Sequence, residues 1–349
     1  MRSVVLILLL LTPPFLAFID HPMSDSEPVL EDESAGPAQV LGGGNPLGWE
    51  WVEKDELAGY LWIREIEALG DGTAFVAGIF SGGSVSVYNH HITNGGGFDV
   101  FIGKRNYDNK WLWLTRFGGA GDEFLNDMKF DNAQDLLLVG TTDSPQVQVT
   151  TNQQTTITHT NLGVVDGWVA HVNSSTGDFS WLTGIGGTGV DNLTGVSQTS
   201  NGDIALCGWT RSPSLTFNGT QYTTAGNEDM VVTWLSSSGS VTKGMVFGNT
   251  GTEMLHDCKV DNNGKTIAVG EFSSSTLVLN QTTISHGGGT GSDSVVLRVS
   301  PQTGVEWVRL PIASAHDLAM SVVVDSAGNI FVAGEHHYNG TGSRTITWG

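Results

Sequence analysis

A repeat of about 64 residues runs through this chain of 349 residues and constrains its fold more than any other feature. Five segments end in an apolar tripeptide followed by glycine, and successive glycines lie 62, 68, 62 and 64 residues apart. These glycines are Gly78, Gly140, Gly208, Gly270 and Gly334. The position 27 residues before each glycine holds Trp51, Trp113, Trp181, Lys243 and Trp307. Four tryptophans at one fixed offset indicate a single structural unit repeated along the chain.

Each unit predicts four β-strands and no helix. In the second unit the expected strands are 99–106, 111–117, 125–131 and 135–141. A glycine six residues before the terminal glycine, as at Gly202, suits a tight turn that needs a positive φ. A polar hairpin of variable sequence and a Gly-rich turn then lead into the next unit. Four antiparallel strands at a fixed period predict an all-β fold, a β-propeller of about five four-stranded blades.

The propeller is expected to span residues 47–349. The units fall at about 37–98, 99–165, 166–228, 229–292 and 293–349. Two alternatives remain for the closure of the ring. Five units close a small ring if the weakly patterned segment Ala38–Leu41 opens the first of them. Otherwise the units belong to a larger propeller that is cut short at Gly349.

Three segments of the repeat carry a resemblance to a known family. Asp99–Lys104 is an apolar strand opened by Asp, Trp113–Glu123 runs from a Trp strand into a Gly-Gly-x-Gly loop, and Asp325–Gly334 is a turn and strand ending in glycine. In these segments the chain resembles the SBBP-type β-propeller repeat family of exported prokaryotic proteins, and the likeness covers about residues 47–349. The resemblance implies a propeller and export, and says almost nothing about function.

The N-terminus predicts export independently of the repeat. Residues 1–19 begin with the positive charge of Arg2 and continue in the apolar run Val4–Leu11, which is typical of a secretory signal peptide. An uncleaved N-terminal membrane anchor is the alternative. Residues 20–46 start with an acidic stretch and are rich in Pro, Ser and Gly, so we expect a disordered spacer. The expected location is extracellular or on the cell surface.

The charge balance excludes two classes of partner. The chain has 15 Lys and Arg against 36 Asp and Glu, for a net charge of −21. A nucleic-acid binder needs a basic stripe that neutralises phosphates, and docking on anionic lipid needs clustered Lys and Arg. We therefore expect no nucleic-acid partner, and membrane contact only through an uncleaved N-terminus.

No segment matches a catalytic or cofactor motif. The chain has no Gly-x-Ser-x-Gly elbow, no phosphate-binding Gly-Lys-Ser/Thr loop and no His-Glu-x-x-His. Gly184–Gly189 fits Gly-x-Gly-x-x-Gly, but it lies between two expected strands, so we interpret it as a turn. Cys207 and Cys258 occupy apolar positions of the repeat, which predicts buried thiols; a bridge between them is the alternative. The protein is not expected to be an enzyme.

Carboxylates recur at two positions of the repeat. One set opens a strand, and the other follows the Trp position by ten residues. The two sets are Asp99, Asp166, Asp229 and Asp293, and Glu123, Asp191, Glu253 and Asp317. Alternate loops share a side of a propeller, so eight carboxylates are expected on one face. Either each binds backbone amides of its own turn, or together they form a ring that attracts Ca²⁺, a cationic ligand or a hydroxyl-rich ligand.

These observations predict a non-catalytic binding or adhesion module for a glycan or a protein. The alternatives are a polysaccharide hydrolase or lyase, marked by two acids about 5–10 Å apart in a cleft, and a structural spacer of a larger surface protein. Five Asn-x-Ser/Thr sequons are candidate glycosylation sites. They are Asn173, Asn192, Asn218, Asn280 and Asn339. The ligand and the oligomeric state stay open.

Overall fold

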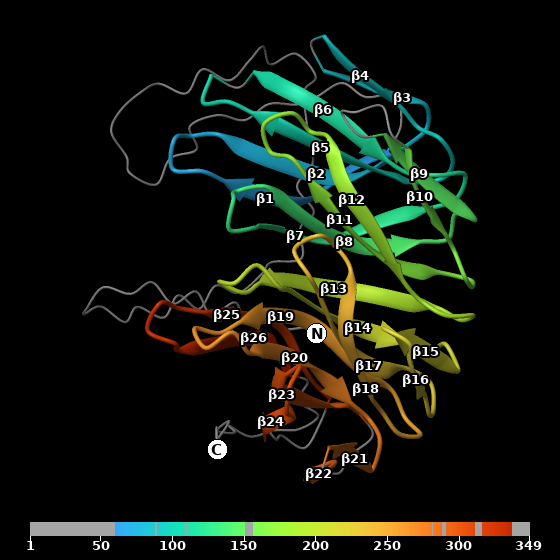
Figure 1. Ribbon diagram of the computed structural model, residues 1–349, viewed down its shortest axis with the longest axis vertical. Coiled ribbons are helices and arrows are strands. Elements are labelled where there is room, and N and C mark those ends of the chain that lie inside the picture. Colours follow the sequence, from blue (N-terminus) through green and yellow to red (C-terminus); the bar gives the residue numbers. More distant parts are fainter. Residues whose placement is uncertain are drawn as a thin grey trace, which may run out of the picture. The chain divides into compact units, whose positions relative to one another are not determined.

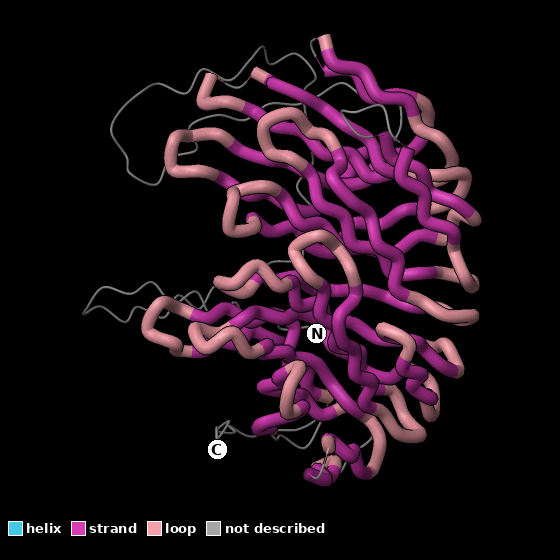
Figure 2. The backbone as a smooth tube through the Cα atoms, viewed as in Figure 1, coloured by secondary structure: helices cyan, strands magenta, loops and turns pink. Residues whose placement is uncertain are grey.

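The computed structural model describes residues 60–87, 89–108, 110–150, 156–280, 282–287, 291–310 and 316–336. All regular elements in these segments are β-strands (Figure 2). Within them, no helix is long and apolar enough to cross a membrane. The signal segment 1–19, the spacer 20–46, Ala38–Leu41 and Trp51 lie outside the described residues.

Four antiparallel sheets of four strands each make up most of the described chain (Figure 1). The first contains β1 (Tyr60–Ala68), β2 (Ala74–Ser81), β5 (Asp99–Arg105) and β6 (Trp111–Phe117). The second contains β7 (Glu123–Phe130), β8 (Leu136–Thr142), β11 (Asp166–Val172) and β12 (Phe179–Ile185). The third contains β13 (Asp191–Gln198), β14 (Ile204–Thr210), β17 (Asp229–Leu235) and β18 (Val241–Phe247). The fourth contains β19 (Glu253–Val260), β20 (Thr266–Phe272), β23 (Asp293–Ser300) and β24 (Gly304–Arg309).

A short hairpin is inserted between the second and third strands of every complete sheet. The hairpins are β3 (Ser84–Val87) with β4 (His90–Thr93), β9 (Gln146–Thr150) with β10 (Thr156–Thr160), β15 (Ser214–Phe217) with β16 (Thr220–Thr223), and β21 (Thr276–Leu279) with β22 (Thr282–Ser285). A further pair, β25 (Asp317–Val324) and β26 (Ile330–His336), repeats the first two strands of a sheet. Repeated four-stranded antiparallel sheets are the blades of a β-propeller, so the predicted fold class is confirmed.

The grouping of strands into sheets differs from the predicted grouping. The strands expected at 99–106, 111–117, 125–131 and 135–141 do not form one sheet, because the first two pair with β1 and β2 and the last two with β11 and β12. The chain passes to the next sheet at residues 118–122, between β6 and β7. Glycines allow this crossing, since a Cβ on Gly119 would lie 2.4 Å from Ser144 Oγ of the next sheet.

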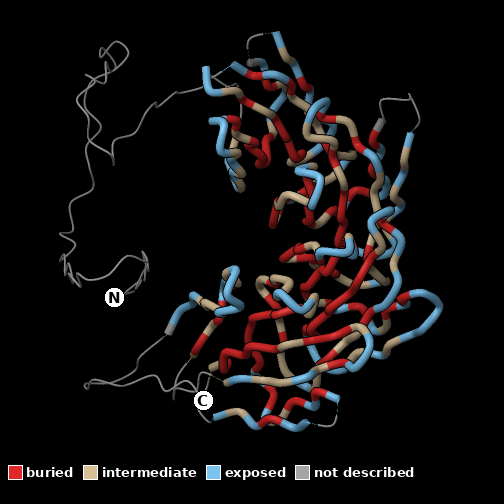
Figure 3. The backbone as a smooth tube through the Cα atoms, turned by 60° about the vertical axis from the view of Figure 1, so that its left-hand side comes forward, coloured by how far each residue is buried: buried red, intermediate tan, exposed pale blue. Residues whose placement is uncertain are grey.

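Neighbouring sheets pack face to face through apolar side chains. Phe75 of the first sheet and Leu125 and Trp168 of the second lie in one buried cluster. Figure 3 shows that buried residues follow the strands and that exposed residues concentrate in loops and hairpins. The first strands of successive sheets, β1, β7, β13, β19 and β25, contact one another in turn. We call these five the inner strands.

Each inner strand contains a β-bulge at the same place, and the repeated glycine lies opposite it. The register shifts around Asn126 in β7 and around Thr194 in β13, and likewise in the other three inner strands. A Cβ on Gly140 would lie 1.8 Å from the carbonyl oxygen of Phe124. The same clash, at 1.8–2.0 Å, would occur at Gly78, Gly208, Gly270 and Gly334. The repeated glycine is therefore required by a close backbone approach.

The two cysteines are buried and unbridged. Cys207 lies in β14 and Cys258 in the neighbouring inner strand β19. Burial raises the pKa of the Cys258 thiol well above its ordinary value, and the adjacent Cys207 adds to this rise. Both side chains belong to the apolar cluster between the third and fourth sheets.

Candidate functional site

The eight repeated carboxylates lie at the starts of strands and are buried. Asp99, Asp166, Asp229 and Asp293 open the third strands of the four complete sheets. Glu123, Asp191, Glu253 and Asp317 open inner strands. None of the eight is more than 4% exposed. They are therefore not presented on an open face of the described structure, as the ring interpretation requires.

The carboxylates form pairs, each joining one sheet to the next. Asp99 Oδ1 and Glu123 Oε2 both lie within 2.8 Å of the point that a Cβ on Gly118 would occupy. Burial raises the pKa of Glu123, and the charge of Asp99 adds a smaller contribution to that rise. The equivalent pairs are Asp166 with Asp191, Asp229 with Glu253, and Asp293 with Asp317.

Backbone amides bind one oxygen of most of these carboxylates. Asp99 Oδ2 accepts a hydrogen bond of 2.6 Å from the Gly95 N–H, four residues earlier. Glu123 Oε2 accepts one of 2.7 Å from the Gly119 N–H, and its Oε1 accepts one from the Thr142 hydroxyl. The same pattern fixes Asp166, Asp191, Asp229, Glu253 and Asp293. These are the bonds that the structural interpretation of the carboxylates predicts.

The second carboxylate oxygen of each aspartate that opens a third strand accepts no hydrogen bond from the described residues. Oδ1 is buried and has no hydrogen-bond partner among the described residues in Asp99, Asp166, Asp229 and Asp293. In Asp229, a buried oxygen without a hydrogen-bond partner favours the protonated acid. Burial accordingly raises the pKa of Asp229 to about 6 and that of Asp293 in the same direction.

The geometry does not favour Ca²⁺ at these pairs. Calcium takes six to eight oxygen ligands, whereas each pair supplies two carboxylates whose other neighbours are N–H and O–H donors. Within the described segments, no three or more His, Cys, Asp or Glu side chains are grouped so that they could hold a metal ion. The pairs also have no opening to substrate, since Asp99 and Glu123 are 0% exposed. They do not meet the requirement of the hydrolase alternative for acids in a cleft.

The repeated tryptophans dock onto the next sheet. Trp113 Nε1 donates a hydrogen bond of 3.2 Å to the Ser174 carbonyl, and Trp181 Nε1 donates one of 3.2 Å to the Ser237 carbonyl. Each acceptor lies in the turn between the third and fourth strands of the following sheet. Trp307 is half-buried against the β25–β26 pair. Trp113, Trp181 and Trp307 therefore each connect one sheet to the next.

The four described sequons lie in different surroundings. Asn218 and Asn280 are exposed at hairpin tips, with φ of 46° and 56°. Asn173 is half-buried in a turn, and Asn192 in β13 accepts a hydrogen bond from Asn126. Asn339 lies outside the described residues. Exposure alone therefore favours Asn218 and Asn280 as glycosylation sites.

A row of three aromatic rings forms a partly exposed platform across the first two sheets. Trp62 of β1 stacks on Phe98 with ring centroids 5.9 Å apart, and Phe98 contacts Phe124 of β7 at 5.8 Å. Trp62 is 54% exposed and Phe124 is 38% exposed. Asp122 lies at the row, since its Oδ1 accepts a hydrogen bond of 2.7 Å from the Phe98 N–H. We call Trp62, Phe98 and Phe124 the aromatic row.

Sequence reasoning missed the aromatic row. Trp62 and Phe124 each pair with the residue that follows the repeated glycine, a position at which the other inner strands carry Asn192, Met254 and Leu318. An alignment of the units by inner strand would have shown two aromatic residues at this position in the first two sheets alone. Only the fold brings Phe98 between them.

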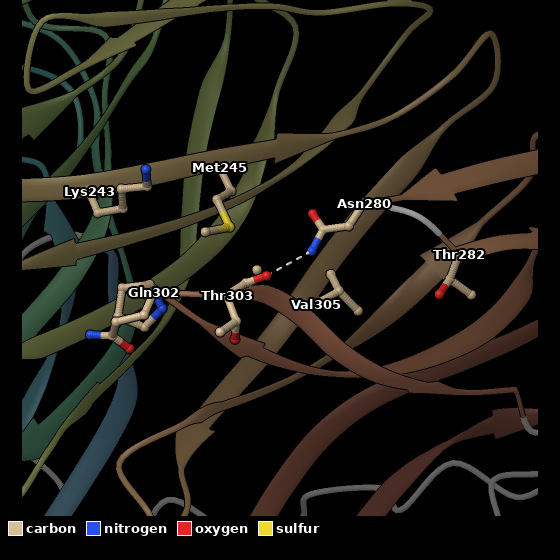
Figure 4. A pocket seen from close by; sticks show the side chains of 9 residues that line it. Lys243, Met245, Asn280, Thr282, Gln302, Thr303 and Val305 are labelled. Carbon is tan, nitrogen blue, oxygen red and sulfur yellow. Dashed lines mark hydrogen bonds between the residues drawn. The ribbon is translucent and has the colours of Figure 1, made fainter.

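A cavity of about 580 Å³ lies between the outer strand of the third sheet and the fourth sheet (Figure 4). Lys243 and Met245 of β18 line one side. The β23–β24 turn and the β21–β22 hairpin line the other, through Asn280, Thr282, Pro301, Gln302, Thr303, Gly304 and Val305. Its volume is within the range of small-molecule sites, about 300–1,000 Å³.

The chain is similar to proteins of known structure, but not to a known family by sequence. No family model matches the chain, and no curated protein matches it. The chain is similar to the WD40 domain of Pan2 from Neurospora crassa, with 11% sequence identity and a TM-score of 0.28. The match covers 82% of this chain and 91% of the Pan2 domain.

Proposed function

We propose that the protein is a non-catalytic, exported β-propeller that binds a glycan on the aromatic row. The single observation behind the proposal is the partly exposed row of Trp62, Phe98 and Phe124, in which Trp62 and Phe124 are exposed. An aromatic face offers an apolar surface on which the C–H face of a sugar ring stacks. Exposed aromatic residues gathered at one place are a common mark of a ligand surface.

Polar groups beside the row supply the specificity that a sugar needs. The Asp122 carboxylate is half-buried next to Phe98 and accepts hydrogen bonds, as a partner for hydroxyl groups must. The backbone of residues 94–97 borders the same loop, and Gly96 is exposed. A row of rings with hydrogen-bonding groups at its margin suits an extended, hydroxyl-rich chain better than a small compact ligand.

Export and the SBBP-type family membership are parts of this proposal that depend on the sequence. The signal-like residues 1–19 and the acidic segment that follows them support an extracellular or cell-surface location. The strand and turn motifs in 99–104, 113–123 and 325–334 support the family. Both agree with a ligand found outside the cell.

A glycan array with the purified protein, followed by calorimetric titration of the best glycan, tests the proposal. Trp62→Ala and Phe124→Ala should each weaken binding at least about tenfold, because each removes one stacking face. Tyr107→Ala is the matched control, since Tyr107 is 75% exposed and does not belong to the row. Unchanged binding in both variants, or an array without any bound glycan, would refute the glycan site.

A further inference from the structure

The cavity beside Lys243 occupies the place that a repeated tryptophan fills at the two preceding blade junctions. Trp113 and Trp181 lie on fourth strands and reach the following sheet, where each ring packs on a turn glycine. A Cβ on Gly177 would lie 2.7 Å from the Trp113 ring, and one on Gly239 would lie 2.5 Å from the Trp181 ring. Both glycines have a positive φ, 79° and 80°. We call this arrangement the tryptophan slot.

The third junction has the same slot without the tryptophan. Lys243 stands at the fourth-strand position of Trp113 and Trp181. The turn between β23 and β24, which faces Lys243, has the same features as the turns of the filled slots. Its glycine, Gly304, has a φ of 81°. Pro301 lies two residues after the last residue of the third strand that pairs with the second strand, as Ser174 and Ser237 do. Lys243, Pro301 and Gly304 all line the cavity. The cavity therefore marks the tryptophan slot of this junction, which holds no tryptophan.

The tryptophan of the third sheet lies on the third strand instead of the fourth, which explains why no tryptophan occupies this slot. In the first and second sheets the cross-strand partner of the tryptophan is Lys104 or His171 on the third strand. In the third sheet the order is reversed, with Trp234 on the third strand and Lys243 on the fourth. Trp234 is 2% exposed and donates a hydrogen bond of 3.0 Å to the Thr266 hydroxyl of the fourth sheet. The indole thus fills the interior of the junction and leaves the outer slot open.

We propose that this slot binds a planar aromatic ligand that carries an N–H or O–H donor and an anionic group. The planar ring and the donor follow from the occupants of the two filled slots, where an indole packs on the glycine and donates to the turn carbonyl. The anionic group follows from Lys243, whose ammonium forms no ion pair among the described residues in a chain of net charge −21. An indole or phenol ring with a carboxylate has this chemistry.

Asn280 covers the floor of the slot and must move aside. A Cβ on Gly304 would lie 2.0 Å from Asn280 Nδ2, so the amide stands where the other slots hold a ring. Its hydrogen bond to the Thr303 carbonyl is 3.3 Å long (Figure 4). Because Asn280 is exposed at a hairpin tip and this bond is long, its side chain needs to break only this one hydrogen bond to turn away. Asn280→Gly preserves the positive φ and should tighten ligand binding several-fold.

Fluorine NMR titration with 5-fluoroindole-3-acetate and neutral 5-fluoroindole tests the proposal on the full chain. The native protein should bind both probes, the acid more tightly. Lys243→Trp should reduce binding of both at least tenfold and raise the melting temperature by about 2–4 °C, because the new ring fills the slot. Lys243→Met should bind the neutral probe as the native protein does and lose the preference for the acid.

Two further variants provide a control for adding a tryptophan and a second way to block the slot. Lys110→Trp adds a tryptophan at another exposed lysine and should leave both titrations unchanged. Thr282→Trp blocks the slot from the exposed hairpin on the opposite wall, which serves if Lys243→Trp does not fold. Native-like binding in the slot-filling variants, or no binding by the native protein, would overturn the proposal.

Discussion

At the scale of a single residue, burial without a full set of hydrogen-bond partners raises the pKa of Asp229, which opens a third strand. Asp229 is 2% exposed, and its Oδ1 has no partner among the described residues. Burial is the largest cause that raises its pKa to about 6, the Ala225 N–H opposes the rise, and the charge of Glu253 adds to it. At neutral pH this carboxylate is therefore ionised in surroundings that favour the acid.

Stability should consequently fall as the pH rises from about 4 to 6. In that window the folded protein holds a proton on Asp229 that the unfolded chain, with an ordinary aspartate pKa, has already released. Asp229→Asn should remove this part of the pH dependence and raise the free energy of unfolding at pH 7 by about 1 kcal/mol. Urea denaturation of both proteins at pH 4, 5, 6 and 7 measures the difference. A native-minus-variant difference that is constant with pH would contradict the shifted pKa.

Among the repeated elements, the inner strand carries the contacts that hold one sheet to the next. Asp127 lies beside the bulge of β7, is 6% exposed and accepts a hydrogen bond of 3.0 Å from the Val196 N–H of β13. Asp257 makes the equivalent bond of 2.9 Å to the Val322 N–H. In β13 and β25, a backbone amide beside the bulge is thus satisfied by an acid from the preceding inner strand.

Removal of Asp127 should therefore cost more than a surface acid does. Asp127→Ala leaves the Val196 N–H without an acceptor and removes the 2.7 Å ion pair with Lys129, so we expect a loss of about 2–3 kcal/mol. Asp127→Asn preserves an acceptor and should lose less. Asp203→Ala, in an exposed turn, is the control for removing an acid. Urea denaturation measures all three, and equal losses for the two substitutions at Asp127 would show that the amide acceptor is unimportant.

The sequence predicted elements well and their grouping poorly, for a physical reason. The strand expected at 111–117 is observed at Trp111–Phe117, and that at 99–106 is observed at Asp99–Arg105. Apolar alternation and turn glycines are local, so they appear in the sequence. A sequence repeat gives the number of residues per unit but does not say which strand of the unit comes first in a sheet. The boundary between sheets depends on which strands pair, and pairing is not visible in the sequence. The aromatic row and the tryptophan slot beside Lys243 likewise depend on contacts between sheets, and the sequence of one repeat unit does not show such contacts.

On the scale of the whole molecule, the charge of −21 must be accommodated with only 15 Lys and Arg. The structure buries paired acids at every complete blade junction and holds them with N–H and O–H donors more than with cations. Buried pairs are screened little by salt, whereas the many exposed acids repel one another at low ionic strength. Salt therefore screens the repulsion between exposed acids, which destabilises the fold, and has little effect on the buried pairs.

Salt should accordingly stabilise the protein, and calcium should do so only as a salt. An increase in NaCl from 20 to 500 mM should raise the melting temperature by a few degrees, because screening weakens repulsion between surface acids. CaCl₂ at matched ionic strength should give the same shift within about 1 °C, because each buried pair supplies only two carboxylates, fewer oxygen ligands than Ca²⁺ needs. Differential scanning calorimetry after treatment with EDTA compares the two salts. Stabilisation by micromolar Ca²⁺, far below the concentration that screens, would instead establish a calcium site and revive the ring interpretation of the repeated acids.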